Sequence, residues 1–146
     1  MIHTLSVLLL SILISFALSI GGKFLADSLL TSRVPIIGSF VSLQYATNSG
    51  VAFSITFPRQ LQNIFIGVAL LCIIFAATKA KTTMSRIAFG MIVGGALGNV
   101  VDRIADGVVT DFFQVGTFPI FNVADSFITI GVFLLLFETI WQWWRR

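Results

Sequence analysis

The sequence is short of charged residues, which make up only 10% of its 146 positions. Soluble domains carry about 25% charged residues, so a surface that faces water cannot be built from this composition. Apolar residues make up 57% of the chain, with 15 phenylalanines among them, and the mean hydropathy is +1.00. The composition therefore excludes a soluble enzyme, a nucleic-acid-binding protein and a disordered linker, and it indicates an integral membrane protein.

Cysteine and histidine are almost missing. Cys72, the one cysteine, lies within an apolar run, so neither an intrachain disulfide nor a thiolate metal site is expected. His3, the one histidine, stands near the start of the sequence, which disfavours zinc sites and the serine–histidine pairs of many hydrolases. We accordingly expect no metal ion and no cofactor.

Four apolar stretches are long enough to cross a bilayer, and we expect each to form a helix. The first covers about residues 5–20 and would reach roughly 24 Å as a helix, or ~30 Å with its flanks. We interpret it as a membrane span rather than a cleaved signal peptide, because no Lys or Arg precedes it and the run is long for a signal core. The other stretches cover about residues 61–78, 87–101 and 127–144.

Basic residues gather at one side of these predicted spans. Three of them crowd the connection at 79–86, and Arg145 and Arg146 follow three tryptophans in the last span. Cytoplasmic connections carry an excess of Lys and Arg, and tryptophan favours the membrane–water boundary. We therefore place both of these regions, and with four spans also the N-terminus, in the cytoplasm. The connections at about 21–60 and 102–125 then lie outside.

Gly90, Gly94 and Gly98 recur every four residues along the third span. Small residues with that spacing form a smooth stripe on one helix face, which another helix can approach closely. We assign this stripe to helix packing and give it no chemical role.

The first outer connection contains short segments with a preference for β-structure. Residues 40–45 and 51–55 are rich in apolar and β-prone residues, and 47–50 between them holds Asn and Gly, which favour a turn. We predict a small extracytoplasmic β-sheet over about residues 34–57. The predicted fold class is mainly α and integral to the membrane, with four transmembrane helices and this small sheet in a single domain over 1–146.

Acidic residues are scarce, so their placement is informative. Four of the six lie together on the outer side, between the third and fourth spans: Asp102, Asp106, Asp111 and Asp125. We expect Asp27 and Asp106 to be solvated at the bilayer boundary, and Glu138 to snorkel or to pair near the cytoplasmic interface. Asp102 and its neighbour Arg103 are expected to form an ion pair that anchors the loop.

Asp111 and Asp125 are the candidates for chemistry. Asn122 is suited to cap the last helix, so Asp125 becomes its third residue, where free backbone N–H groups stabilise a carboxylate. Asp111 lies in an apolar, strand-like stretch, where a lone carboxylate usually has a partner or a function. Gly116 and Pro119 permit the chain to turn back, so that the two carboxylates face each other. Such a pair shares one proton and can hydrolyse a peptide bond by activating water and polarising the carbonyl.

Four blocks of sequence resemble those of the lipoprotein signal peptidases (signal peptidase II), in the same order and spacing. They cover residues 48–53, 94–103, 109–112 and 121–126, and the similarity extends over essentially the whole chain. The resemblance implies an aspartic peptidase of the bacterial inner or cytoplasmic membrane. The family's substrate is a prolipoprotein that carries diacylglycerol on a cysteine, and cleavage falls just before that cysteine.

The resemblance also assigns roles to residues. Asp111 and Asp125 would form the catalytic dyad, and the outer sheet would be the family's β-cradle. Positions that bind substrate or support the site would be Asn48, Gly50, Asn99, Asp102, Arg103, Asn122 and Ala124. The expected partners are the lipidated prolipoprotein and membrane lipids, and the expected oligomeric state is a monomer. Ser19 stands where the family often has an Asp, four residues before the Lys that matches Lys23, and Gln114 stands where many members have Asp. We expect neither departure to abolish activity.

Three other functions fit parts of the sequence. A transporter or channel needs a polar site near the bilayer midplane, and the first three spans hold no acid. A magnesium-dependent lipid transferase would use Asp102, Asp106 and Asp111, because magnesium prefers oxygen ligands. A Ser-Lys peptidase would use Ser19 and Lys23, which share a helix face at i, i+4.

Overall fold

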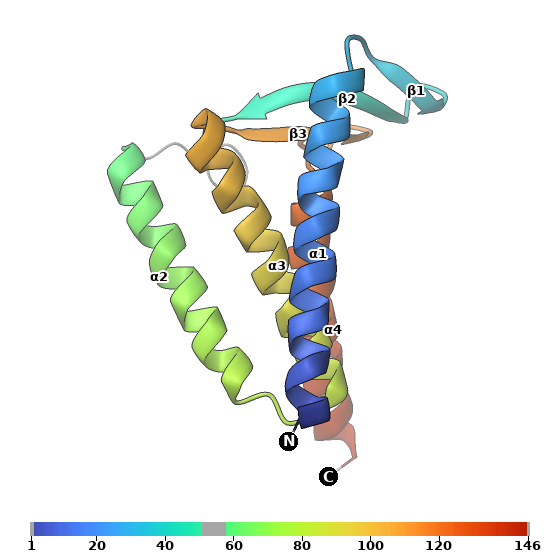
Figure 1. The fold of residues 1–146 in the computed structure, drawn as a ribbon. Coiled ribbons are helices and arrows are strands. Elements are labelled where there is room, and N and C mark those ends of the chain that lie inside the picture. The colour runs from blue at the N-terminus through green and yellow to red at the C-terminus, as the bar shows by residue number, and fades with distance from the viewer. Residues whose placement is uncertain (1, 51–57, 146) are drawn as a thin grey trace.

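The computed structural model of the protein describes residues 2–50 and 58–145. Four long helices run side by side, and a small sheet covers one end of them (Figure 1). The helices are α1 (Ile2–Leu29), α2 (Arg59–Thr78), α3 (Thr83–Asp106) and α4 (Val123–Trp144). The strands are β1 (Val34–Ile37), β2 (Val41–Asn48) and β3 (Val109–Val115). Both termini lie at the end opposite the sheet (Figure 1). We call the two ends of the molecule the sheet end and the terminal end.

All four helices are long and apolar enough to cross a membrane. Large apolar side chains on their outer faces are exposed, among them Leu13 on α1, Leu71 on α2 and Phe133 on α4. A helix that is apolar on its outward face is stable only where that face meets lipid or protein. The predicted fold class, four membrane helices with a small sheet, is confirmed. α1 continues to Leu29, beyond the predicted end at residue 20, because apolar residues such as Phe24 and Leu25 extend its outer face.

The predicted glycine stripe is the contact between α1 and α3. The three glycines of the stripe face three serines of α1 with the same spacing: Ser11, Ser15 and Ser19. A Cβ added at Gly90 would lie 2.5 Å from the Cβ of Ser11, so an alanine there would force the helices apart. The close approach lets Ser11 donate a hydrogen bond to the Ile87 carbonyl at 2.9 Å and Ser15 to the Gly90 carbonyl at 3.2 Å. Packing by small residues is confirmed as the role of the stripe.

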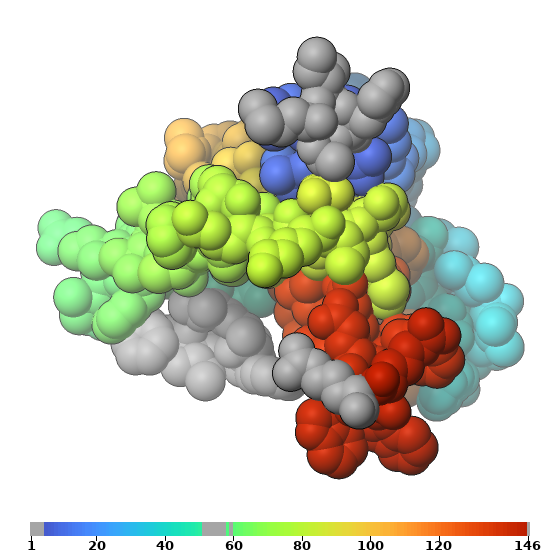
Figure 2. Space-filling model, turned by 90° about the horizontal axis from the view of Figure 1, so that it is seen from below, coloured from blue at the N-terminus to red at the C-terminus, as the bar shows by residue number. Residues whose placement is uncertain are grey.

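α2 has the fewest neighbours among the four helices. Its main contact is with α3, whereas α1, α3 and α4 contact one another. Seen from the terminal end, α2 projects from the group formed by the other three helices (Figure 2). The residues that position the site therefore come from α1, α3, α4 and the sheet.

The sheet is antiparallel, with strand order β1-β2-β3. β1 and β2 form a hairpin that turns at Gly38, whose φ of +52° is left-handed and favours glycine. The prediction placed a turn at residues 47–50, but β2 runs through to Asn48, and its other partner is the distant β3. The second predicted strand, at 51–55, lies outside the described residues. Ala46 of β2 is opposite Asp111, so the pairing brings a predicted catalytic residue onto the sheet.

The chain reverses after β3, as predicted. Gly116 has a left-handed φ of +54°, and its N–H donates to the Phe40 carbonyl at 2.7 Å. Phe121 then pairs with Phe113, and α4 begins directly afterwards with Asn122 as its N-cap. This reversal sets the start of α4 beside β3 and thereby brings Asp125 and Asp111 to the same end of the molecule.

Candidate active site

Asp125 is held at the start of α4 by a capping box, as the sequence predicts. Its N–H donates to Asn122 Oδ1 at 2.9 Å, and the Asn122 N–H donates to Asp125 Oδ2 at 3.3 Å. Asn99, on α3, donates from Nδ2 to Asp125 Oδ1 at 2.9 Å. Each oxygen of this half-buried carboxylate therefore accepts a hydrogen bond, and the helix N-terminus favours its negative charge.

Asp111 lies on β3 and is almost fully buried, with 3% of its surface exposed. Its Oδ1 accepts from Asn122 Nδ2 at 2.9 Å, and its Oδ2 accepts from Asn48 Nδ2 at 3.2 Å. Asn122 thus contacts both carboxylates, one with its side-chain nitrogen and the other with its backbone N–H. The structure brings the two predicted dyad residues together through this one asparagine.

The amide orientations of Asn48 and Asn122 each follow from a backbone N–H that donates to the side-chain oxygen. The N–H of Gly50 donates to Asn48 Oδ1 at 2.9 Å, which turns Nδ2 of that residue toward Asp111. The N–H of Asp125 fixes Asn122 Oδ1 in the same way, so its Nδ2 is free to donate to Asn99 Oδ1 at 3.0 Å. Of the two polar atoms in an amide side chain, only the oxygen can accept from a backbone N–H. The nitrogen of each of these two asparagines is therefore the atom that donates to Asp111.

The surroundings of Asp111 change how readily its carboxyl group ionises. Burial raises the pKa of Asp111 to about 6, and the negative charge of Asp125 acts in the same direction. Hydrogen bonds from Asn48 and Asn122, and the positive charge of Arg103, oppose this and lower the pKa of Asp111. A carboxyl with such a pKa keeps its proton more readily than an ordinary aspartate, as one member of a proton-sharing pair must.

Arg103 connects the end of α3 to the segment that follows β2. Its Nη2 donates to the Gly50 carbonyl at 2.9 Å, and Nη1 lies 3.5 Å from the Asn99 carbonyl. The predicted ion pair between Asp102 and Arg103 is wrong, since the ion pair found for Asp102 among the described residues is with Lys23. Consecutive residues on a helix point about 100° apart, so these two side chains reach different surroundings.

Comparisons with known proteins show the family of this chain. The family model described as "Signal peptidase (SPase) II" matches residues 11–141, which is most of the chain and includes both aspartates. The chain belongs to the signal peptidase II family.

Two curated relatives illustrate the likeness. A "Lipoprotein signal peptidase" of Caldicellulosiruptor bescii is 42% identical over 118 residues, covering 79% of this chain and 75% of the relative. Another, of Pelodictyon phaeoclathratiforme, is 35% identical over 145 residues, covering 89% and 85%. A solved structure described as a bacterial membrane enzyme is 28% identical with a TM-score of 0.77, and covers 89% of this chain and 87% of the other. This signal peptidase II is therefore a hydrolase and a multi-pass bacterial membrane protein.

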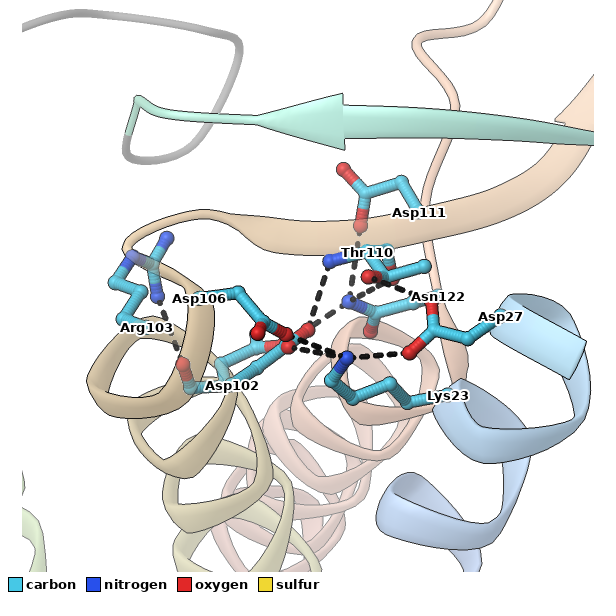
Figure 3. A network of polar contacts seen from close by, with 9 residues as sticks. Lys23, Asp27, Asp102, Arg103, Asp106, Thr110, Asp111 and Asn122 are labelled. Carbon is cyan, nitrogen blue, oxygen red and sulfur yellow. Dashed lines mark hydrogen bonds and ion pairs between the residues drawn. The ribbon is translucent and has the colours of Figure 1, made fainter.

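Lys23 is the main feature of this signal peptidase that sequence reasoning left out of the site. Its Nζ lies between the carboxylates of Asp27, Asp102 and Asp106 (Figure 3). The expectation that Asp27 and Asp106 are simply solvated is therefore wrong: because α1 continues to Leu29, it places Lys23 and Asp27 against the last turns of α3. The i, i+4 spacing of Lys23 and Asp27 was the one signal for this cluster in the sequence.

The remaining predicted positions have simpler surroundings. Gly50 supplies the backbone groups that meet Asn48 and Arg103. Ala124 is buried where α4 meets α3 at Gly98, so its small side chain serves packing.

At the terminal end, Glu138 accepts from Thr82 Oγ1 at 2.5 Å and from Gln142 at 3.2 Å, in line with the expected pairing. The departing residue Gln114 accepts from Ser42 at 3.1 Å.

The residues suggested for the alternative enzymes do not converge. Asp102 and Asp106 turn toward Lys23, whereas Asp111 faces Asn48 and Asn122. Within the part of the chain that the structure describes, no three His, Cys, Asp or Glu side chains are grouped so as to hold a metal ion. Ser19 Oγ donates to the Ser15 carbonyl at 2.7 Å, and the Lys23 Nζ is surrounded by carboxylates. Ser19 and Lys23 therefore do not form a Ser-Lys pair.

Proposed function

We propose that this signal peptidase II is an intramembrane aspartic endopeptidase that removes the signal peptide from diacylglyceryl-modified prolipoproteins. Cleavage falls just before the lipidated cysteine. The observation that carries the proposal is the pair of carboxylates on β3 and α4, which Asn122 joins, together with the burial that raises the pKa of Asp111. Family membership supplies the substrate class, and the geometry supports the chemistry.

In this mechanism Asp125 acts as the base and Asp111 as the acid. Asp125 is the charged partner, since it lies in the first turn of α4, where the helix N-terminus stabilises negative charge. It takes a proton from water while the water oxygen bonds to the peptide carbonyl carbon. Asp111, the buried and protonated partner, donates a hydrogen bond to the carbonyl oxygen as negative charge develops there. The C–N bond then breaks, and the proton held by Asp125 passes to the leaving nitrogen.

The neighbouring polar residues hold this pair for the reaction. Asn48, Asn99 and Asn122 each direct a side-chain N–H at a carboxylate oxygen, and so limit how the dyad can rotate. Arg103 holds the Gly50 carbonyl and brings positive charge near both aspartates. A single membrane-embedded domain, working as a monomer, would supply the whole site in this proposal.

The site lies at the sheet end, and we place this end outside the cytoplasm. The connection from α2 to the first turn of α3, which holds Lys79, Lys81 and Arg86, lies at the terminal end, together with both termini and the last turn of α4 (Figure 1). Since cytoplasmic connections are enriched in basic residues, both termini face the cytoplasm. A lipid-anchored substrate would then reach the dyad from the outer leaflet, in contact with membrane lipids.

The test is cleavage of two forms of one precursor by the purified protein. We expect release of the signal peptide from a diacylglyceryl-modified prolipoprotein, and much less from the same precursor without lipid. Asp111→Asn and Asp125→Asn should each abolish release, whereas Asp106→Asn, a matched change at an exposed carboxylate, should retain it. Equal cleavage of the unlipidated precursor would contradict the proposed substrate, and full activity of either dyad variant would contradict the mechanism.

A further inference from the structure

Lys23 and three carboxylates form a cluster beside the strand that carries Asp111 (Figure 3). The Lys23 Nζ lies 2.5 Å from Asp27 Oδ2, 2.8 Å from Asp106 Oδ2 and 3.1 Å from Asp102 Oδ1. Lys23 and Asp27 are one turn apart on α1, and Asp102 and Asp106 are one turn apart on α3. None of these groups takes part in the chemistry proposed above.

The three carboxylates of the cluster are not equivalent. The Asp102 side chain is 5% exposed, whereas that of Asp106 is 50% exposed. A buried carboxylate is stable only when an opposite charge and hydrogen bonds replace the water that it has lost. Lys23 supplies the charge, and the backbone N–H of Thr110 donates to Asp102 Oδ2 at 2.7 Å within the interior. Asp102 therefore joins the cation on α1 to the backbone of β3.

Thr110 receives a second contact from the same cluster. Its Oγ1 donates to Asp27 Oδ1 at 3.3 Å, so the hydroxyl and the N–H of one strand residue both bond to carboxylates from the helices. Thr110 directly precedes Asp111. Successive side chains of a strand point to opposite faces, so a rotation or slide of β3 at Thr110 would move the Asp111 carboxylate away from its partners.

We infer that Lys23, Asp27 and Asp102 act through Thr110 as positioning residues for Asp111, an inference that rests on the proposed peptidase function. Lys23 holds the two carboxylates, the carboxylates hold Thr110, and Thr110 sets the place of the next residue on the strand. Asp106 contacts Lys23 from a half-exposed position, and among the residues that the structure describes its ion pair is with Lys23 alone. It therefore serves as the internal control, because it shares the charge of the cluster without a bond to the strand.

The first experiment changes the Thr110 hydroxyl only. Thr110→Val keeps the branched shape that suits a strand and removes the donor to Asp27, whereas Thr110→Ser keeps the donor. On the lipidated precursor, Thr110→Val should lower kcat by about two- to tenfold, the effect of one hydrogen bond, with KM little changed. Thr110→Val should also shift the pH profile of kcat/KM, because the surroundings of Asp111 change. Thr110→Ser should keep kcat and the pH profile close to those of the wild type. Thermal unfolding in the same detergent separates these effects from a loss of folded protein.

The second experiment compares matched truncations at two carboxylates that both contact Lys23. Asp27→Ala should lower kcat and shift the pH profile as Thr110→Val does, whereas Asp106→Ala should leave both close to the wild type. Equal losses in the two alanine variants, or a Thr110→Val variant that behaves as the wild type, would overturn the positioning role. If Asp27→Ala does not fold, the Thr110 variants decide the question alone. A wild-type protein that cannot cleave the lipidated precursor would overturn the proposed function, and the positioning role with it.

Discussion

Asn122 offers the sharpest test of the site, because one side chain both begins α4 and joins the two carboxylates. Its Oδ1 accepts from the Asp125 N–H at 2.9 Å, and its Nδ2 donates to Asp111 at 2.9 Å and to Asn99 at 3.0 Å. Two substitutions separate these roles. Asn122→Ala removes both, whereas Asn122→Ser keeps an oxygen that can cap the helix and removes the links to Asp111 and Asn99.

The expected stability losses follow from these contacts. Either variant leaves a buried oxygen of Asp111 without its donor, which costs about 1–3 kcal/mol of unfolding free energy. Loss of the N-cap adds about 1 kcal/mol, so Asn122→Ala should be the less stable of the two by that amount. Unfolding of both variants in one detergent measures the difference. Equal stability of the alanine and serine variants would show that the cap contributes nothing.

The pH dependence of cleavage tests the other role of Asn122. Its hydrogen bond lowers the pKa of Asp111, so removing it should raise that pKa further above about 6. If Asp111 works in its protonated form, kcat/KM falls as pH rises through this pKa, and the alkaline limb should move to higher pH in both variants. Maximal activity should fall as well, because the carboxylate is no longer held. An Asn122→Ser variant with the wild-type profile would refute the proposed link between the two carboxylates.

Other predictions concern the dyad itself and the helix contact beneath it. Asp111→Asn and Asp125→Asn should both abolish cleavage, and Asp125→Asn should also cost up to ~1 kcal/mol through its weaker interaction with the helix N-terminus; substantial activity in either would end the dyad assignment. Because folding raises the pKa of Asp111 to about 6, the stability of the wild type relative to Asp111→Asn should be greatest at low pH. It should decline by up to ~3 kcal/mol between about pH 4 and 6, as the unfolded chain loses this proton first; a flat difference would mean that the carboxyl ionises as in the unfolded chain. Gly94→Ala should destabilise the protein by about 1–3 kcal/mol, because its Cβ would meet Ser15 on α1. Gly67→Ala on α2 meets nothing within 4 Å and should be neutral or slightly stabilising, so equal losses at both glycines would contradict close packing as the cause.

Features that depend on neighbouring residues could be predicted from the sequence. The four spans follow from apolar runs of sufficient length, since the energy of placing a segment in lipid is a sum over its own side chains. The capping of α4 by Asn122 with Asp125 depends on a spacing of three residues and is present as predicted. The glycine stripe at 90, 94 and 98 predicted close packing because every fourth residue shares a helix face. In each case the physical cause lies within one helix.

Which elements and side chains contact one another could be seen only in the tertiary structure. No spacing indicates that β2 pairs with β3 across the whole of α2 and α3, or that Asn99 reaches Asp125 from another helix. The same holds for Asp102, which was expected to pair with its neighbour in sequence but meets Lys23 from α1.

The sequence by itself determined the candidates for chemistry in this peptidase, since carboxylates are few and stand out against an apolar chain. Only the tertiary structure decided how readily Asp111 ionises. The pKa of Asp111 depends on how deeply β3 is covered and on charges that lie far away in sequence, on Asp125 and Arg103. Solvation and Coulomb energies are functions of distance through space, and the order of residues does not contain those distances until the helices have packed.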